Sequence, residues 1–342
     1  MAYERTGTGQ AMRRPSVWRR GRLLLLTALA LAPALAQAPR TRSAPSSRGP
    51  SEAAQQADSA AQVERDRPTG WALAEHRRLD RALRSIQAER PGVVDAYVVT
   101  VALDSEPVFV REAREAGRVL ARRYDAAGRT IVLAGPDGSR GGGDDLPRGS
   151  PETLAAVLAR VAEVMDRRQD VLVLYTTSHG APFGIVYADG DRGAGAISPA
   201  WLRRTLGELH IANRLLIISA CFSGVFVPVL ADADTAIITA AAANRTSFGC
   251  VAENDWTFFG DAMINHGLRD PVPLSTSFAE ARRLVGGWEG QGKLIPSNPQ
   301  VAIGRDVAKW LTPLEDRMPR TTSAPVGRPA ADALDDARRN NH

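Results

Sequence analysis

Cysteine is scarce in this sequence, and long apolar runs are missing. Only two cysteines occur in 342 residues, too few for a disulfide scaffold, and no Cys-x-x-Cys pair suggests a structural zinc. The leucine-rich run Leu23–Ala32 is shorter than the roughly 20 residues that a membrane-spanning helix needs. What remains is ordinary for a globular protein: 44% of the residues are hydrophobic, and the length suits one large α/β domain with tails.

A basic excess is also missing from most of the chain, although the formal net charge is +5. Residues 1–36 hold six arginines and one acid, Glu4, a net +5, so subtracting them leaves a net charge of about zero for the rest. No basic stripe therefore remains to neutralise phosphates, and we expect no nucleic-acid partner.

The leader has the pattern of a secretory signal peptide. Arginines between residues 13 and 22 precede the apolar run, and the small residues Ala34, Ala36 and Ala38 follow it. A basic start, a short apolar centre and an A-x-A site predict cleavage after Ala36 or Ala38. The alternative is an uncleaved anchor, in which case only the leader contacts a membrane. Both alternatives predict an extracytoplasmic location, periplasmic or secreted.

Composition divides the chain into four parts. We predict a signal peptide or anchor at 1–38, a disordered linker at 39–67, a folded domain at 68–312 and a disordered tail at 313–342. The linker and the tail have few large apolar side chains, so they cannot bury enough surface to offset the entropy lost on ordering.

Strands and helices alternate through the folded part. Apolar runs predict strands at 93–103, 130–133, 170–177, 214–219, 234–239 and 300–303, and helical spacing predicts helices at 71–89, 109–124, 151–168, 198–209, 256–266 and 275–288. Ser150 followed by Pro151 predicts a helix start. Apolar strands separated by helices indicate a mostly parallel sheet covered on both faces, with ligands bound at the carboxyl ends of its strands.

Two of these strands end in residues that can carry out catalysis. One strand runs into Ser-His-Gly at His179, and another into Ala-Cys-Phe-Ser-Gly at Cys221. If the strands are parallel neighbours, both side chains lie on one edge of the sheet, and the imidazole can take the thiol proton. Gly180 allows a tight turn, and its N–H and that of Cys221 are candidate donors to an oxyanion. The alternative is a small buried cysteine beside a structural histidine.

Four motifs together carry a family resemblance. The segments YTTSHG (175–180), ISACFSG (218–224), TAAAANRTSFGC (239–250) and ENDWTFFGD (253–261) resemble the legumain family of caspase-like cysteine peptidases, in its secreted bacterial branch, over about residues 94–304. The resemblance implies a Cys221–His179 dyad on a caspase-like α/β/α sandwich with a sheet of about six strands. It also implies a peptide or protein substrate, with no metal or other cofactor in the chemistry.

The resemblance further implies a pocket for P1, the substrate residue before the cut bond, which in legumains is Asn and sometimes Asp. Arg111, Ser247 and Asp261 fall where a pocket arginine, serine and acid are expected. An arginine and a carboxylate on opposite walls can donate to the oxygen and accept from the nitrogen of a carboxamide. For Arg111 and Asp261 the alternative is a surface charge, and for Ser247 a turn residue.

The sequence departs from the family at two places. Phe222 replaces the family glutamate after the nucleophile, which removes a charge from the pocket. The asparagine that orients the histidine is replaced near Phe109, which weakens that orientation. A polypeptide-binding envelope protein without activity, and a transamidase, therefore stay open beside an endopeptidase. A Cys221–Cys250 bridge would silence the nucleophile, but we expect Cys250 to be a buried thiol under the active-site loop.

Overall fold

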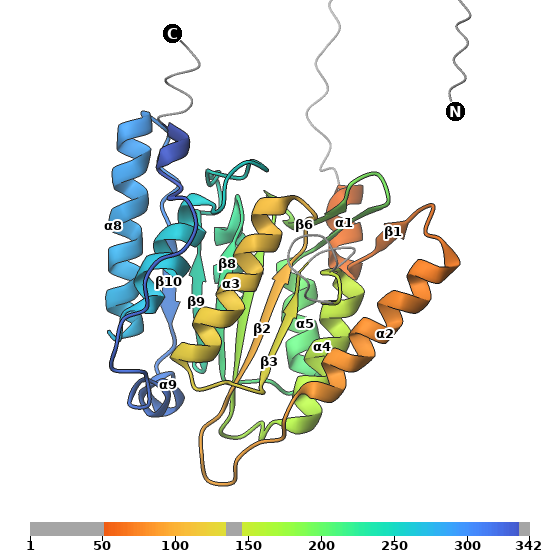
Figure 1. Ribbon diagram of the computed structural model, residues 1–342, viewed down its shortest axis with the longest axis horizontal. Coiled ribbons are helices and arrows are strands. Elements are labelled where there is room, and N and C mark those ends of the chain that lie inside the picture. The colour runs from red at the N-terminus through yellow and green to blue at the C-terminus, as the bar shows by residue number, and fades with distance from the viewer. Residues whose placement is uncertain (1–50, 135–145, 335–342) are drawn as a thin grey trace, which may run out of the picture. The chain divides into compact units, whose positions relative to one another are not determined.

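The computed structural model describes residues 51–134 and 146–334, which are built around a six-stranded sheet (Figure 1). The strands lie in the order β10 (Gln300–Ile303), β9 (Thr235–Thr239), β8 (Arg214–Ser219), β4 (Val171–Thr177), β2 (Ala96–Ala102) and β3 (Thr130–Leu133). Every neighbouring pair is parallel except β10 with β9. The prediction of a mostly parallel sheet of about six strands is confirmed.

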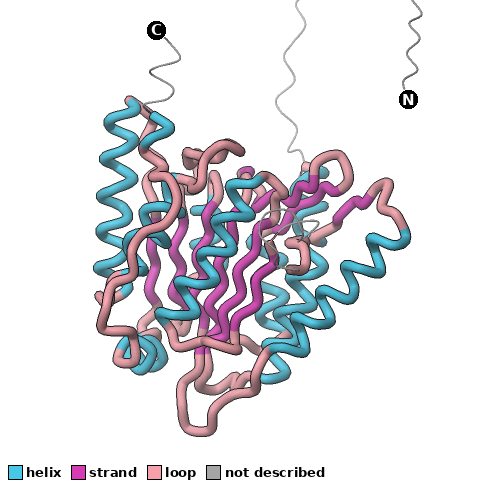
Figure 2. The backbone as a smooth tube through the Cα atoms, viewed as in Figure 1, coloured by secondary structure: helices cyan, strands magenta, loops and turns pink. Residues whose placement is uncertain are grey.

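Helices cover both faces of this sheet (Figure 2). Along β2 the side chains alternate: Ala96 and Val98 join the apolar cluster on one face, and Tyr97 and Val99 the cluster on the other. The first face packs against α3 (Pro107–Arg123), α8 (Leu274–Gly292) and α9 (Ala308–Glu315), and the second against α2 (Thr69–Ser85), α4 (Pro151–Val164), α5 (Pro199–Glu208) and α6 (Val227–Leu230). This is the predicted α/β/α sandwich.

Helix α4 begins where the sequence predicts. The Ser150 hydroxyl accepts a hydrogen bond from Thr153 N at 3.2 Å, and the Thr153 hydroxyl accepts one from Ser150 N at 2.9 Å. Pro151, at the first helical position, has no N–H to leave unpaired. This capping box fixes the point at which the chain enters the helix.

A second, antiparallel sheet lies beyond the carboxyl end of β4. Its order is β1 (Gln62–Glu64), β7 (Gly193–Ile197), β6 (Gly184–Asp189) and β5 (Gly180–Ala181). Strand β5 follows His179 directly, and His179 O accepts a hydrogen bond from Val186 N at 3.0 Å. The small sheet therefore holds the backbone of this histidine and of the two residues that follow it.

The predicted disordered linker at 39–67 is wrong for its described part. Residues 52–59 form α1 (Glu52–Ser59), where Ala57 is fully buried and its carbonyl accepts from Ser198 N at 3.1 Å. β1 then pairs with β7, with Val63 opposite Ala194. The segment has few large apolar side chains to bury, and main-chain hydrogen bonds between β1 and β7 stabilise it instead.

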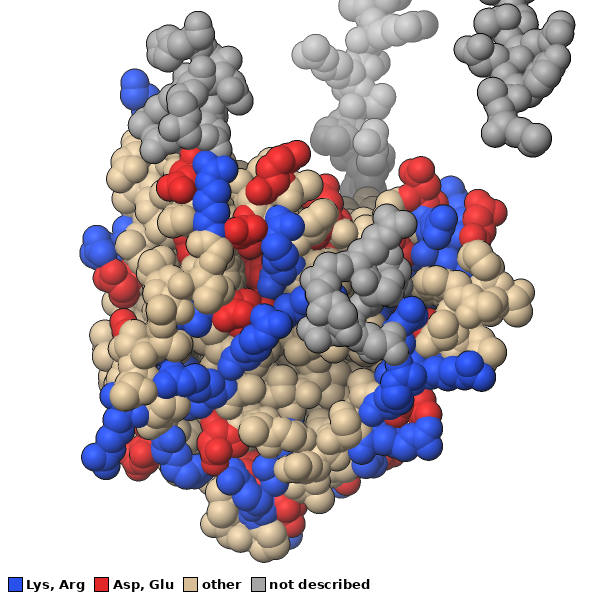
Figure 3. Space-filling model, in the orientation of Figure 1, with Lys and Arg blue, Asp and Glu red and all other residues tan. Residues whose placement is uncertain are grey.

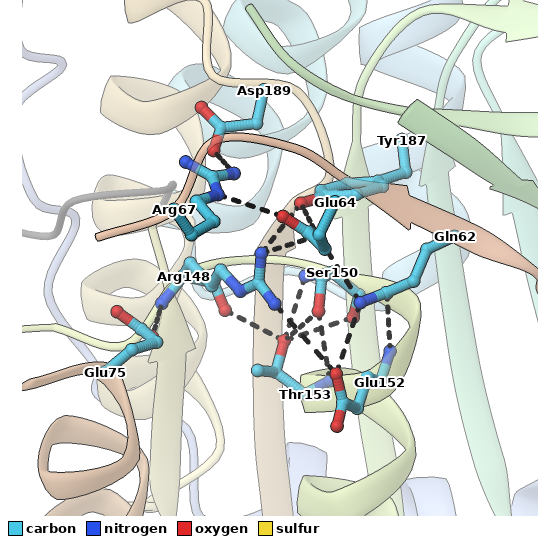
Figure 4. A network of polar contacts seen from close by, with 10 residues as sticks. All are labelled: Gln62, Glu64, Arg67, Glu75, Arg148, Ser150, Glu152, Thr153, Tyr187 and Asp189. Atoms are coloured by element: carbon cyan, nitrogen blue, oxygen red, sulfur yellow. Dashed lines mark hydrogen bonds and ion pairs between the residues drawn. The ribbon is translucent and has the colours of Figure 1, made fainter. Parts of the chain in front are cut away.

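A polar network fixes β1 to the domain (Figure 4). The Glu64 carboxylate accepts from Arg67 Nε at 3.0 Å, from Arg148 Nη1 at 2.6 Å and from the Tyr187 hydroxyl at 2.7 Å. Arg67 also pairs with Asp189 at the end of β6. These contacts tie β1 and the residues that lead into α2 to β6 and to the residues that lead into α4.

The predicted disordered tail at 313–342 is wrong for residues 313–334. Leu314 and Ala330 are 1% and 2% exposed, and Val326 O accepts from the Trp256 indole N–H at 2.8 Å. The predicted helix at 256–266 becomes three short pieces: α7 (Phe258–Gly260), the π-helical η2 (Asp261–His266) and the 3₁₀ turn η3 (Gly267–Arg269). One further 3₁₀ turn, η1 (Ser223–Phe226), follows Cys221.

Within the described residues, none of the helices is long and apolar enough to cross a membrane. The predicted leader, residues 1–38, lies outside them. On the face shown in Figure 3, basic and acidic side chains are interspersed.

Candidate functional site

Strands β4 and β8 bring His179 and Cys221 to the same edge of the main sheet. The strands are parallel neighbours in which Thr177 lies opposite Ser219, and Ser178 N donates to Ser219 O at 3.2 Å. His179 and Cys221 each follow this last pair by two residues. The juxtaposition predicted from the strand ends is therefore present in the structure.

The sulfur of Cys221 is half-buried and surrounded by hydrogen-bonding groups. Sγ accepts from Ser247 N at 3.2 Å and lies 3.6 Å from Ser247 O. A hydrogen bond from the Cys250 thiol lowers the pKa of Cys221 to about 6, aided by the Ser247 N–H and the charge of His179, although burial acts in the opposite direction. Such a sulfur is largely a thiolate at neutral pH.

Cys250 is a free thiol, as is Cys221. It packs beside Val108 and Phe109 at the start of α3. Its hydrogen bond to the Cys221 sulfur and its burial both raise its pKa. Cys250 therefore remains a protonated donor to Cys221. It is unbridged, as expected, but it is only partly buried.

Gly180 lies directly against the backbone of Cys221. A Cβ at this position would be 2.9 Å from the carbonyl carbon of Cys221 and 3.0 Å from its nitrogen, and closer still to its carbonyl oxygen. Real side chains do not tolerate such contacts with backbone, so this approach requires glycine. The predicted oxyanion donors Gly180 and Cys221 are thus neighbouring backbone segments.

Phe222, next to Cys221, has a strained backbone. Its φ is +57°, in the left-handed region that non-glycine residues rarely adopt, and its N–H donates to Arg245 O at 2.7 Å. The sharp turn ends β8 and starts η1, leaving Cys221 on the rim. Strain at this point is typical of a functional turn that the surrounding structure enforces.

Two groups from the start of α3 face the imidazole of His179. Glu106 Oε1 lies 3.6 Å from His179 Nε2, and both side chains are 42% exposed. The Phe109 ring meets the imidazole edge-on, with ring centroids 5.1 Å apart and an interplanar angle of 82°. A carboxylate and an aromatic ring thus stand where the family asparagine was expected.

Glu112 is a fully buried carboxylate beneath the strand ends. Its Oε1 accepts from the hydroxyls of Tyr175, Thr177 (2.7 Å) and Ser219 (3.0 Å). Its Oε2 accepts from Thr257 N at 2.9 Å and from the Thr257 hydroxyl at 2.8 Å. All five donors are neutral, and they come from β4, β8 and the start of α7. Glu112 therefore links the two strands that carry His179 and Cys221.

Arg111 does not stand free in a pocket. Its Nη2 donates to Ala252 O at 2.8 Å and to Asn254 O, and its Nε lies 3.2 Å from Asp255 Oδ1. Arg111 therefore fastens the loop 250–255 to α3. Its predicted role as a P1 ligand would require it to leave these partners.

Asp261 does not line a pocket, and this prediction is wrong. Its side chain is fully buried, Oδ2 accepts from Ala330 N at 2.7 Å, and Oδ1 accepts from Asn265 Nδ2 at 2.8 Å with His266 Nε2 3.5 Å away. The first turn of η2 directs this carboxylate toward the C-terminal segment. Of the four predicted pocket residues, Phe222 and Ser247 remain beside Cys221.

Sequence reasoning overlooked Glu106 and Glu112, although each left a signal. Glu106 follows the carboxyl end of β2, at the same edge of the sheet where the neighbouring strands β4 and β8 end. Glu112 lies three residues after Phe109 and four before Ala116, both buried, so it occupies the apolar face of α3. A charge on such a face has to find polar partners inside the domain.

Comparison with known proteins found a family match and a structural neighbour. No curated protein matches the chain. Caspase-1 from Spodoptera frugiperda is a structural neighbour at 13% identity and a TM-score of 0.42, covering 64% of this chain and 92% of its own. Residues 151–291, which include His179 and Cys221, match the Peptidase C13 family. That match confirms the resemblance to the legumain family, which is peptidase family C13, and supports a cysteine peptidase.

Proposed function

We propose that this protein is an extracytoplasmic cysteine endopeptidase that acts through Cys221 and His179. The observation that carries the proposal is the environment of the Cys221 sulfur, which receives hydrogen bonds from Ser247 N and the Cys250 thiol and has a pKa of about 6. The thiolate, and not the thiol, is the nucleophilic form of cysteine. An environment that stabilises the Cys221 thiolate therefore favours an enzyme over a protein that only binds polypeptide.

The proposed reaction is acyl transfer in two steps. The Cys221 thiolate attacks the peptide carbonyl, and the N–H groups of Gly180 and Cys221 donate to the oxyanion. Protonated His179 gives its proton to the leaving amine, which becomes the amino terminus of the released peptide. Water, deprotonated by His179, then hydrolyses the acyl-enzyme and restores the thiolate.

For P1 we propose a preference broader than Asn and Asp. The acid expected opposite Arg111 is buried as Asp261, Arg111 binds carbonyls of the loop 250–255, and Phe222 replaces the family glutamate. Neither position 222 nor position 261 therefore places a carboxylate opposite Arg111 in a P1 pocket. A library with P1 varied measures this preference directly.

The test is hydrolysis of a peptide library by the wild type, Cys221→Ala and His179→Ala, with His76→Ala as a control because His76 is an exposed histidine of α2. We expect cleavage by the wild type and the control, and loss of activity in both site variants. Retention of peptides without cleavage by the wild type would indicate the polypeptide-binding alternative. Transfer of the acyl group to an added amine, in place of hydrolysis, would indicate a transamidase.

The extracytoplasmic location is part of the proposal and rests on the leader. Residues 1–38 have the basic, apolar and A-x-A order of a signal peptide. Amino-terminal sequencing of the protein from a periplasmic or secreted fraction should give a start at residue 37 or 39. A start at residue 1 in a membrane fraction would show a retained anchor instead.

A further inference from the structure

We propose that Glu106 is the positioning residue for His179, the third member of a Cys221–His179–Glu106 arrangement; this rests on the endopeptidase function proposed above. Oε1 of Glu106 lies 3.6 Å from Nε2 of His179. The carboxylate holds the Nε2–H, which leaves Nδ1 to exchange the proton with Cys221 and with the leaving amine.

The fold fixes the backbone of Glu106 from two sides. The buried Asp104 side chain accepts from Glu106 N at 2.8 Å, and Ser105 N donates to Ala188 O of β6 at 2.9 Å. Because β6 also binds the backbone of His179, the two residues are held by the same strand. Pro107 starts α3, and the Glu106 side chain makes no cap hydrogen bond to that helix, so it is left to face the imidazole.

The aromatic neighbour explains why a carboxylate is needed. Phe109 is fully buried and presents its ring edge-on to His179, so it limits the tilt of the imidazole. A phenyl ring offers no hydrogen-bond acceptor to fix which nitrogen carries the proton, whereas a carboxylate does. Glu106 thus supplies the acceptor that Phe109 cannot.

The separation of 3.6 Å is that of an ion pair, longer than a hydrogen bond. Such contacts shorten when the reacting complex forms, and here the imidazolium that forms beside the thiolate attracts the carboxylate. Both side chains are 42% exposed, so solvent weakens the interaction. We therefore expect a moderate effect, not the loss that follows removal of a nucleophile.

The experiment compares Glu106→Ala, Glu106→Gln and Glu106→Asp with Glu163→Gln, a control on an exposed glutamate at the far end of α4. We expect kcat to fall about tenfold in Glu106→Ala with KM nearly unchanged, a smaller fall in Glu106→Gln, and partial rescue in Glu106→Asp. Glu163→Gln should match the wild type. A merely structural role would lower the melting temperature and raise KM in all three Glu106 variants.

A substrate-free measurement separates this proposal from the proposed function. Alkylation of Cys221 by iodoacetamide at pH 6 should slow several-fold in Glu106→Ala. Without the Glu106 carboxylate the imidazole of His179 is no longer held in position, so it stabilises the Cys221 thiolate less. Unchanged kcat and unchanged alkylation in Glu106→Ala would overturn the proposal for Glu106. If the wild type hydrolyses no peptide, the endopeptidase proposal fails, and the alkylation rates alone decide the role of Glu106.

Discussion

The most direct prediction concerns the thiolate of Cys221. With a pKa of about 6, in place of an ordinary 9.0, about half of the sulfur is ionised at pH 6, against about 0.1% for an ordinary thiol. A low-pKa thiolate is intrinsically less nucleophilic, by about 20-fold for a shift of this size. The net gain in alkylation rate is therefore about 20-fold at pH 6 and only a few-fold at pH 7. The pH dependence, and not the rate at neutral pH, is the decisive readout.

The perturbation is Cys250→Ala, which removes the largest contribution to the lowered pKa. We expect the midpoint of iodoacetamide labelling at Cys221 to move from about 6 toward higher pH. Labelling followed by peptide mass mapping assigns the modified site. Since the pKa of Cys250 is raised, no second labelling step should appear below pH 9 in the wild type.

The matched control is Cys250→Ser, whose hydroxyl can still donate to the sulfur. Its midpoint should lie between those of the wild type and Cys250→Ala. A wild-type midpoint near 9 would refute the reasoning about the thiolate. The same midpoint in the wild type and in Cys250→Ala would refute the role of Cys250 as the donor.

Three further predictions concern Gly180, Asp261 and the Cys221–Cys250 pair. Gly180→Ala should lower kcat/KM more than about 100-fold, since its Cβ would overlap the Cys221 backbone, and kinetics beside a melting curve test this. Asp261→Ala should lower the free energy of unfolding by about 1–3 kcal/mol in a urea titration, because Ala330 N loses its acceptor, while kcat stays at the wild-type value. Hydrogen peroxide should oxidise Cys221 to a sulfenic acid that condenses with the Cys250 thiol, releasing water; dithiothreitol should then restore activity in the wild type and much less in Cys250→Ala.

The parts of the fold that sequence could predict are those with strong local signals. β8, β3 and β10 have the predicted bounds. In β8 a continuous apolar run marks a strand that is buried along its whole length, and in β3 and β10 short apolar runs mark strands at the edges of the sheet. The antiparallel strands β1, β5, β6 and β7 were missed. β1 and β5 have only three and two residues, β7 contains two glycines, and β1 forms only by pairing with the distant β7. α1 was missed because its sequence is rich in Ala and Gln and resembles a linker.

The same limit applies to the site. Cys221, His179 and Gly180 could be placed from strand ends because parallel neighbours share an edge. Asp261 could not, because the direction of its side chain depends on a π-helical turn and on a C-terminal segment far away in sequence. Glu112 was hidden for a similar reason: its donors come from three separate elements.

The pairing of β1 with β7 has a consequence for how the protein can be shortened. A chain that begins at residue 68, the domain boundary suggested by composition, lacks β1 and leaves β7 with a bare edge, a surface on which strands of other molecules add. It also leaves the guanidinium of Arg148 without the Glu64 carboxylate. Removal of the leader after Ala36 or Ala38 keeps all of these contacts. A shortened chain that is to stay folded and monomeric should therefore begin before α1.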